Sequence, residues 1–172
     1  MPKGLKATSS PIQISANATE GGPNTFATEE IQLTLNVLDN EVFVITQVNI
    51  DVDAPDLVSG TTTQVSASLS STRRTTVGSI AQQNVLASAR REIVMAASST
   101  GDGGIAFDRE DPLFAALEQD YLGIVATNNM FLNIQGFQNG NPKVVQCRVY
   151  GYRATADSST YAALVQSELL SA

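Results

Sequence analysis

Apolar and polar residues alternate along most of this chain, which is the pattern of β-strands that turn one face towards a core. The longest such segment covers residues 42–52, where apolar residues and Thr46 occupy the even positions and the odd positions become polar after Ile45. We therefore expect a strand with one face that is apolar along its whole length. The opposite face is expected to be buried only at the start of the strand and exposed to solvent afterwards. The same pattern predicts a final strand over 143–155. Shorter segments of this kind lie at 10–15, 31–37, 62–72, 91–97, 121–127 and 130–137, the last two joined by an Asn-Asn turn that predicts a hairpin.

Two segments have helical patterns instead. Residues 157–170 begin at Asp157, a residue type that caps helix N-termini, and repeat apolar residues at helical spacing. This apolar stripe consists of Tyr161, Leu164, Val165 and Leu169. Residues 111–120 begin with an Asp-Pro pair and predict a short mid-chain helix. Residues 78–90 fit either a helical turn or a long loop between strands.

The order of these elements predicts an all-β fold. Strands do not alternate regularly with helices, which argues against a parallel α/β fold. Roughly eight antiparallel strands in two sheets make a jelly-roll sandwich. An immunoglobulin-like sandwich is the alternative, weakened by the absence of tryptophan and of a cysteine pair. We expect a flexible N-terminal arm (residues 1–9) and a single eight-stranded jelly-roll domain (10–172) that includes the C-terminal amphipathic helix (157–170).

The composition indicates a surface that is covered by neighbouring molecules. The chain has 172 residues, of which 42% are hydrophobic and only 16% are charged, whereas average soluble proteins have roughly 25% charged residues. A free monomer generally keeps itself soluble through surface charge, so we expect large contact surfaces between copies. The alternative is a monomer whose surface is rich in serine and threonine.

The residue types that are missing exclude several functions. The chain has no histidine, so the usual general base, zinc ligand and triad partner are absent, and we expect no enzymatic activity. The only cysteine, Cys147, lies on the apolar face of the final predicted strand and is expected to be a buried, inert thiol. A net charge of −7 argues against specific nucleic-acid recognition.

No segment approaches the roughly 20 apolar residues of a transmembrane helix. No apolar core of a signal peptide follows the basic start of the chain. We therefore expect a protein that is made in a cytosol and stays soluble or assembles there.

One acidic cluster is a candidate cation site. Asp51, Asp53 and Asp56 lie at the end of a predicted strand, and the first two project from the same face. Calcium prefers several hard oxygen ligands from such loops, so these residues predict a structural Ca²⁺ site, although their spacing is not that of an EF-hand. A second acidic cluster lies at 102–111. The alternative is that these carboxylates cap turns and a helix start; no other cofactor is expected.

Basic and apolar residues at three places are candidates for contacts with neighbouring copies. Lys3 and Lys6 lie in the predicted arm, and Arg73 and Arg74 form a basic pair in a loop. The stripe Tyr161, Leu164, Val165 and Leu169 either packs against the chain's own sheet or docks on a neighbouring subunit.

These features together resemble one known family. An N-terminal arm, about eight antiparallel strands, long loops rich in serine and threonine and no catalytic residue set resemble the single jelly-roll capsid proteins of icosahedral, tailless viruses, including viruses that enclose a membrane. The tail CRVYGYRATADSSTYAALVQSELLSA is similar to structural proteins of environmental phages. The resemblance covers the whole chain through its architecture and includes no defining motif.

The resemblance implies a structural protein of the virion that is synthesised in the host cytoplasm. It would self-assemble into pentameric or hexameric capsomers of an icosahedral shell, alone or with a second capsid protein. The alternative function is a receptor- or glycan-binding β-sandwich of a phage tail, a fibre or a cell surface. Glycan-binding proteins usually display aromatic residues on loops, whereas aromatic residues make up only 6% of this chain.

Overall fold

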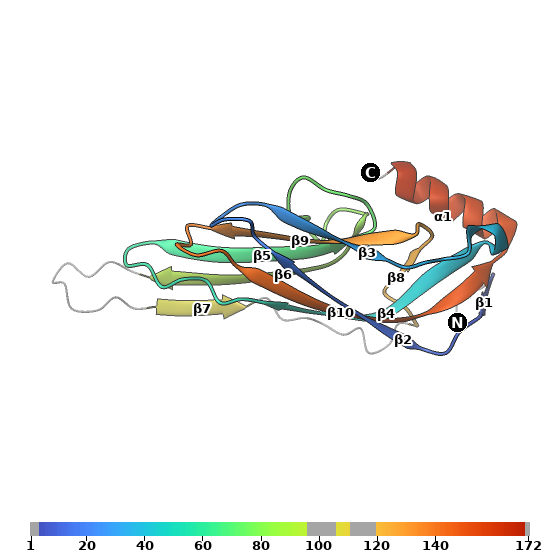
Figure 1. Cartoon of the computed structure of the whole chain (residues 1–172), viewed down its shortest axis with the longest axis horizontal. Helices are drawn as coiled ribbons and strands as arrows, with labels where there is room; N and C mark the ends of the chain where they lie inside the picture. Colours follow the sequence, from blue (N-terminus) through green and yellow to red (C-terminus); the bar gives the residue numbers. More distant parts are fainter. Residues whose placement is uncertain (1–3, 96–105, 111–119, 171–172) are drawn as a thin grey trace.

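Two antiparallel five-stranded sheets pack face to face in a computed structural model of the chain (Figure 1). The structure describes residues 4–95, 106–110 and 120–170, with the backbone alone for 106–110 and Leu169. Sheet A contains β1 (Leu5–Ala7), β2 (Ile12–Thr19), β4 (Glu41–Val52), β8 (Gly123–Val125) and β10 (Val144–Ala156). Sheet B contains β3 (Ala27–Gln32), β5 (Thr62–Ser70), β6 (Val85–Met95), β7 (Ala106–Glu110) and β9 (Asn129–Phe137). A 3-10 turn (Val37–Asp39) and a helix, α1 (Ser158–Leu170), complete the described elements.

The strand order of each sheet shows how the chain crosses between the two layers. Sheet A has the order β1-β10-β4-β8, and β2 also pairs with β10, so β1 and β2 follow one another along the same edge. Sheet B has the order β3-β9-β5-β6-β7. The predicted all-β sandwich is therefore confirmed at the level of two packed antiparallel sheets, and the described residues contain ten strands where eight were expected.

The main core fills the space between the sheets. It receives alternate side chains of the central strands, as the sequence pattern predicted. The fully buried members include Phe43, Ile45, Val65, Leu69, Leu132 and Ile134. Full burial of one such side chain stabilises the fold by roughly 1.5–3 kcal/mol, so this core is the main source of stability.

Strand β4 does not keep one apolar face along its whole length. Its register against β10 shifts between Tyr150 and Gly151, which leaves Thr46 as an extra residue. A β-bulge of this kind moves the side chains on its two sides to opposite faces. The residues of β4 that face the main core are therefore Phe43 and Ile45 before the bulge and Val48, Ile50 and Val52 after it. The continuous apolar face predicted from the even positions is wrong, because Val42 and Val44 face the outside of sheet A.

A second, smaller core covers the outside of sheet A at one end. Val42 and Val44 of β4 meet Ala154 and Ala156 of β10 there, and Leu5 of β1 completes the buried set together with Ala126. Helix α1 packs on this core through Tyr161, Leu164 and Val165. Figure 1 shows α1 and β1 together at this end of the sandwich. The helix therefore packs against the chain's own sheet, the first of the two predicted alternatives.

Helix α1 begins as the sequence predicted. The Asp157 carboxylate accepts hydrogen bonds from the Thr160 backbone N–H (2.7 Å) and from the Ser159 hydroxyl (2.7 Å). These bonds stabilise the ionised carboxylate, the Thr160 N–H most of all, and they lower the pKa of Asp157. Asp157 is thus a helix N-cap.

Residues 5–7 correct the prediction of a free arm over residues 1–9. They form β1 and pair with Ala154–Ala156 of β10, with Leu5 opposite Ala156. Leu5 is buried in the second core, and the burial of this apolar side chain gives the segment a reason to be ordered.

The predicted hairpin over 121–137 is also wrong. β8 pairs with β4 in sheet A, whereas β9 pairs with β3 and β5 in sheet B. The connection passes from one sheet to the other, and Asn128 holds it in place. The Asn128 backbone carbonyl accepts from Leu33 N–H (2.7 Å), and its side-chain oxygen accepts from Leu35 N–H (3.1 Å). The Asn-Asn pair therefore lies in a connection between the two sheets and not in a turn between two paired strands.

The ambiguous segment 78–90 divides into two parts. Residues 85–90 belong to β6, and the preceding loop, residues 71–84, folds over the outer face of sheet B. The Gly78 N–H donates to the Ser68 hydroxyl (2.9 Å), and Ser68 is fully buried although it points away from the main core. The predicted mid-chain helix at 111–120 lies outside the described residues for all but its last position. Of the acidic cluster at 102–111, residues 106–110 form β7, and the other residues lie outside the described part of the chain.

Glu168 is a buried acidic residue of α1 that contacts the connection between β8 and β9. Its Oε1 accepts a hydrogen bond from the Ala126 backbone N–H (3.0 Å), and the residue is 8% exposed. Burial raises the pKa of Glu168 above its usual value of 4.5, and the hydrogen bonds from Ala126 and Thr127 only partly offset this effect.

The raised pKa gives a pH-dependent prediction. The folded state binds the Glu168 proton more tightly than the unfolded state, so the contribution of Glu168 to stability is full below pH 4.5 and is lost as pH rises through the raised pKa. Glu168→Gln keeps an oxygen acceptor for Ala126 and cannot ionise. We expect the stability of this variant to improve relative to that of the natural chain as the pH rises from 4 to 7. Urea titrations at both pH values measure this difference in the free energy of unfolding.

Glu168→Ala is the matched control for this prediction. It removes the acceptor of a buried N–H and should cost about 1–3 kcal/mol. A Glu168→Gln variant whose stability difference from the natural chain is the same at both pH values would contradict the assignment.

Candidate functional site

The three aspartates predicted to bind calcium do not form a common site. Asp51 is exposed on the outer face of β4, and the Asp53 carboxylate accepts from the Val144 backbone N–H (2.9 Å). Asp56 forms an ion pair with Lys143 (Oδ1–Nζ, 2.5 Å). Among the residues that the structure describes, no three histidine, cysteine or acidic side chains gather closely enough to hold a metal ion. The structure does not support the predicted calcium site, because β10 and the residue before it engage two of the three carboxylates.

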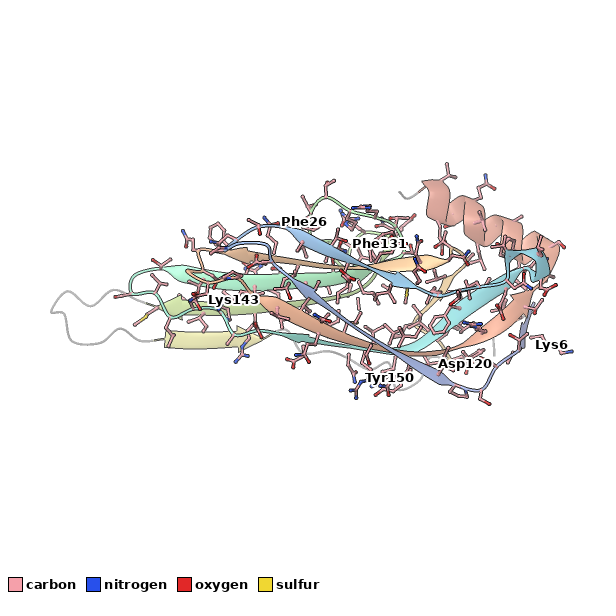
Figure 2. The ribbon with its side chains drawn as sticks, viewed as in Figure 1. Lys6, Phe26, Asp120, Phe131, Lys143 and Tyr150 are labelled. Atoms are coloured by element: carbon pink, nitrogen blue, oxygen red, sulfur yellow. The ribbon has the colours of Figure 1, made fainter. Side chains whose placement is uncertain are left out.

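Asp56 and Lys143 instead join two loops at the end of the sandwich opposite α1. The second Asp56 oxygen accepts from the backbone N–H groups of Gly140 (2.8 Å) and Asn141 (3.0 Å). The Lys143 ammonium also donates to the Ala54 carbonyl oxygen (2.9 Å). The hydrogen bond from Lys143 is the main cause that lowers the pKa of Asp56. Figure 2 shows Lys143 at this end, where the β2–β3, β4–β5 and β9–β10 connections meet.

Glu20 and Asn139 extend this set of contacts. The Glu20 carboxylate is buried and accepts from the backbone N–H of Gly136 (2.6 Å) through one oxygen and from that of Lys143 (2.9 Å) through the other. Asn139 accepts from the Asp56 N–H (2.9 Å) and donates to the Gln64 carbonyl oxygen (2.8 Å).

We call Glu20, Asp56, Asn139 and Lys143 the loop clasp. Each of these four side chains has its polar groups engaged by the chain itself. The loop clasp thus satisfies buried polar groups and fixes three loops, which is a structural role.

The basic residues predicted to contact neighbours have different roles in the structure. Lys6 lies on β1 at the α1 end and points away from the sandwich (Figure 2). Arg73 is exposed. Arg74 is engaged within its own loop, where it donates to the Gln82 side-chain oxygen (2.7 Å) and the Asn84 side-chain oxygen (3.0 Å). Lys3 lies outside the described residues, and so does the side chain of Leu169.

Large apolar side chains are exposed on loops at both ends of the sandwich. At the loop-clasp end, Leu57 is 66% exposed in the β4–β5 loop and Phe137 is 55% exposed at the end of β9. At the α1 end, Leu38 in the 3-10 turn is 93% exposed. Tyr161, Leu164 and Val165 are half-buried against the second core, so the chain itself covers much of their surface. The loop side chains are therefore better placed for contacts with another molecule than the predicted helix stripe.

The outer face of sheet A carries a polar hollow of about 540 Å³ next to the second core. It is lined by β2, β10 and β4, with β10 in the middle, and the register of these strands places polar side chains side by side. The polar residues that line it are Ser15, Asn17, Asn49, Asp51, Gln146 and Arg148. This hollow, which we call the sheet A hollow, is the candidate binding site of the chain.

Cys147 lies on the strand that forms the floor of the sheet A hollow, with its side chain in the main core. Burial raises the pKa of its thiol to about 12, so the thiolate is not populated at neutral pH. This confirms the predicted buried thiol, and the chemistry of the hollow is that of hydrogen bonds and not of a nucleophile.

Sequence reasoning identified the individual polar faces of the hollow but not the hollow itself. The alternation of β10 placed Gln146 and Arg148 on one face, and that of β4 placed Asn49 and Asp51 together. The contribution of β2 was missed. Its signal is the repeat of Ser15 and Asn17 at every second position, but the sequence does not show that β2 pairs with β10.

A scan against protein-family models found no family that matches the chain, and searches of curated proteins and of solved structures found no match either. No helix in the described part of the chain is long and apolar enough to cross a membrane.

Proposed function

We propose that the chain is a structural, non-enzymatic subunit that self-assembles into capsomers of an icosahedral viral shell. The observation that carries the proposal is the strand order. When β1 and β7 are set aside and the other eight strands are numbered along the chain, sheet A reads 1-8-3-6 and sheet B reads 2-7-4-5. This order supports a jelly-roll topology, an architecture of viral capsid proteins, lectins and cupins.

The chemistry of the chain favours the capsid protein among these three classes. Cupins bind metal ions through histidines, and this chain contains none. A fold alone does not determine function, so the surface has to support the choice. Only 16% of the residues are charged, and large apolar side chains are exposed at both ends, among them Leu38, Leu57 and Phe137. Such side chains are typical of surfaces that another molecule covers.

The two ends of the sandwich are suited to contacts between copies. The loop clasp holds the β4–β5 and β9–β10 loops rigidly, so Leu57 and Phe137 are presented at a fixed place. Rigid, preorganised contact residues lower the entropic cost of association. We propose that these loops take part in closed rings of five or six subunits within the virion, either of this chain alone or together with a second capsid protein, after synthesis in the host cytoplasm.

Assembly can be tested on the purified full chain by light scattering and negative-stain electron microscopy over a wide range of protein concentration. We expect rings or closed shells of many copies. The double variant Leu57→Asp/Phe137→Asp places charges in the proposed contact. We expect it to raise the protein concentration required for assembly at least tenfold, so that monomers predominate where the natural chain assembles. Glu29→Lys is the control, because it reverses a charge at an exposed position of β3 outside the β4–β5 and β9–β10 loops, and it should assemble normally. A chain that stays monomeric at every concentration would contradict the proposal.

A further inference from the structure

We propose that the sheet A hollow binds an uncharged glycan. The proposal names a binding site on the subunit and does not rest on the assembly proposed above. It is carried by three observations: a hollow of suitable size, a regular array of polar side chains in it, and the fact that four of these side chains make no hydrogen bond or ion pair with the described residues.

The strand register builds the array. Gln146 of β10 lies between Asn17 of β2 and Asp51 of β4, and two residues further on Arg148 lies between Ser15 and Asn49. Side chains at such cross-strand positions have Cβ atoms about 4.5–5.5 Å apart, close to the spacing of groups that bind neighbouring hydroxyls of one sugar ring. Amides, a carboxylate and a guanidinium can each bind a pair of hydroxyl groups, because each offers two polar atoms in one plane.

A third row continues the array along the strands. Tyr150 lies between Gln13 of β2 and Gln47 of β4. Figure 2 shows Tyr150 on the outer side of sheet A, away from the main core. The three rows span about 13 Å along the strands, since each strand residue rises about 3.3 Å. This length fits a short oligosaccharide, with Tyr150 available to pack against the apolar face of a sugar ring.

The key polar groups of the hollow are not used by the protein. Asn17, Asp51 and Gln146 make no side-chain hydrogen bond with the described residues, and Arg148 makes neither a hydrogen bond nor an ion pair with them. The loop clasp is the opposite case, because its polar side chains form hydrogen bonds with other groups of the chain. The hollow therefore offers donors and acceptors that no described residue engages, which is the condition for a polar ligand.

The charges of the hollow indicate an uncharged ligand. It contains one carboxylate, Asp51, and one guanidinium, Arg148, so its local charge is zero. The whole chain carries a net charge of −7, which disfavours an anionic glycan. The volume of about 540 Å³ lies in the range of small-ligand sites, roughly 300–1,000 Å³.

The β4 bulge explains why the hollow is open. Before Thr46, the outer face of sheet A is apolar and helix α1 covers it; after Thr46, the outer face is polar and nothing among the described residues covers it. The same sheet face thus has a structural half and a free half, and the free half is the proposed site.

The test uses the full chain with a panel of uncharged oligosaccharides: maltotriose, cellotriose, mannotriose, lactose and triacetylchitotriose, with sialyllactose as an anionic comparison. Saturation-transfer NMR detects binding, and isothermal titration calorimetry gives the dissociation constant. We expect at least one uncharged member to bind. Asp51→Ala and Arg148→Ala should each weaken its binding at least tenfold without a change in the thermal unfolding midpoint.

Arg90→Ala is the matched control, because Arg90 is an exposed arginine on the other sheet and pairs with Glu92 (2.8 Å). It should leave glycan binding unchanged. The proposal is overturned if no uncharged glycan binds up to the solubility limit, if sialyllactose binds most tightly, or if the Asp51 and Arg148 variants leave the affinity unaltered. It is also overturned if these two variants change only the oligomeric state, since the hollow would then be a contact between copies.

Discussion

Replacing Glu20 by alanine is expected to lower the free energy of unfolding by about 2–4 kcal/mol. The Glu20 carboxylate accepts from Gly136 of β9 in sheet B and from Lys143 next to β10 in sheet A, so it links the two sheets at the loop-clasp end. Alanine would leave two buried N–H groups without an acceptor. Urea-induced unfolding followed by circular dichroism measures the loss.

Two further variants separate this role from a general effect of charge. Glu20→Gln keeps one oxygen acceptor but turns an amide N–H₂ towards the other donor, so its loss should be intermediate. Glu29→Ala removes an exposed carboxylate of β3 and should change stability by less than about 0.5 kcal/mol. If Glu20→Ala were as stable as Glu29→Ala, the buried carboxylate would not hold the loops.

The Glu20 variant also connects the loop clasp to the proposed assembly. Loss of the clasp would release the loops that carry Leu57 and Phe137. We therefore expect Glu20→Ala to assemble less well at temperatures where it is still folded, because its contact residues are no longer held in place.

Gly151→Ala is the second variant for which we expect a large effect, a loss of about 2–4 kcal/mol. Gly151 lies opposite the β4 bulge. A Cβ atom at this position would collide with the Val44 carbonyl oxygen and would lie 2.8 Å from the Phe43 ring. The backbone collision cannot be relieved by a rotamer change, so β4 and β10 would have to move apart. Thermal and urea unfolding measure the cost.

Phe43→Leu in the Gly151→Ala background identifies the source of the cost. It removes the contact with the ring but keeps the contact with the Val44 carbonyl, so we expect no recovery of stability. Gly21→Ala is the control, because a Cβ atom there would meet nothing within 4 Å. Full rescue by Phe43→Leu would show that side-chain crowding, and not the close approach of two backbones, requires a glycine at this position.

The sequence pattern predicted the elements that depend on their own residues. The final strand was expected at 143–155 and is observed at Val144–Ala156, and the cap at Asp157 is in place. Both depend on local chemistry: alternation along one strand, and a carboxylate next to free backbone N–H groups. The buried Cys147 followed from the same alternation.

The predictions that failed depend on which segments lie side by side. Asp51, Asp53 and Asp56 are close in sequence, but Lys143 and Val144, about ninety residues later, engage two of them. The Asn-Asn pair resembled a hairpin turn, whereas Asn128 binds the segment after β3. A local signal does not specify a partner at long sequence separation, and most pairings in this sandwich are of that kind.

The sequence by itself therefore determined the strand-rich character of the chain, its final strand and helix cap, its inert cysteine and its poverty in charge, because each of these is a property of neighbouring residues or of composition. Only the tertiary structure decided that Thr46 is a bulge, that α1 covers one half of the outer face of sheet A, and that β2, β10 and β4 leave a polar hollow on the other half. The physical reason is that a bulge, a second core and a hollow are formed by strand pairing, and the pairing is selected by the burial of the whole sandwich and not by any one segment.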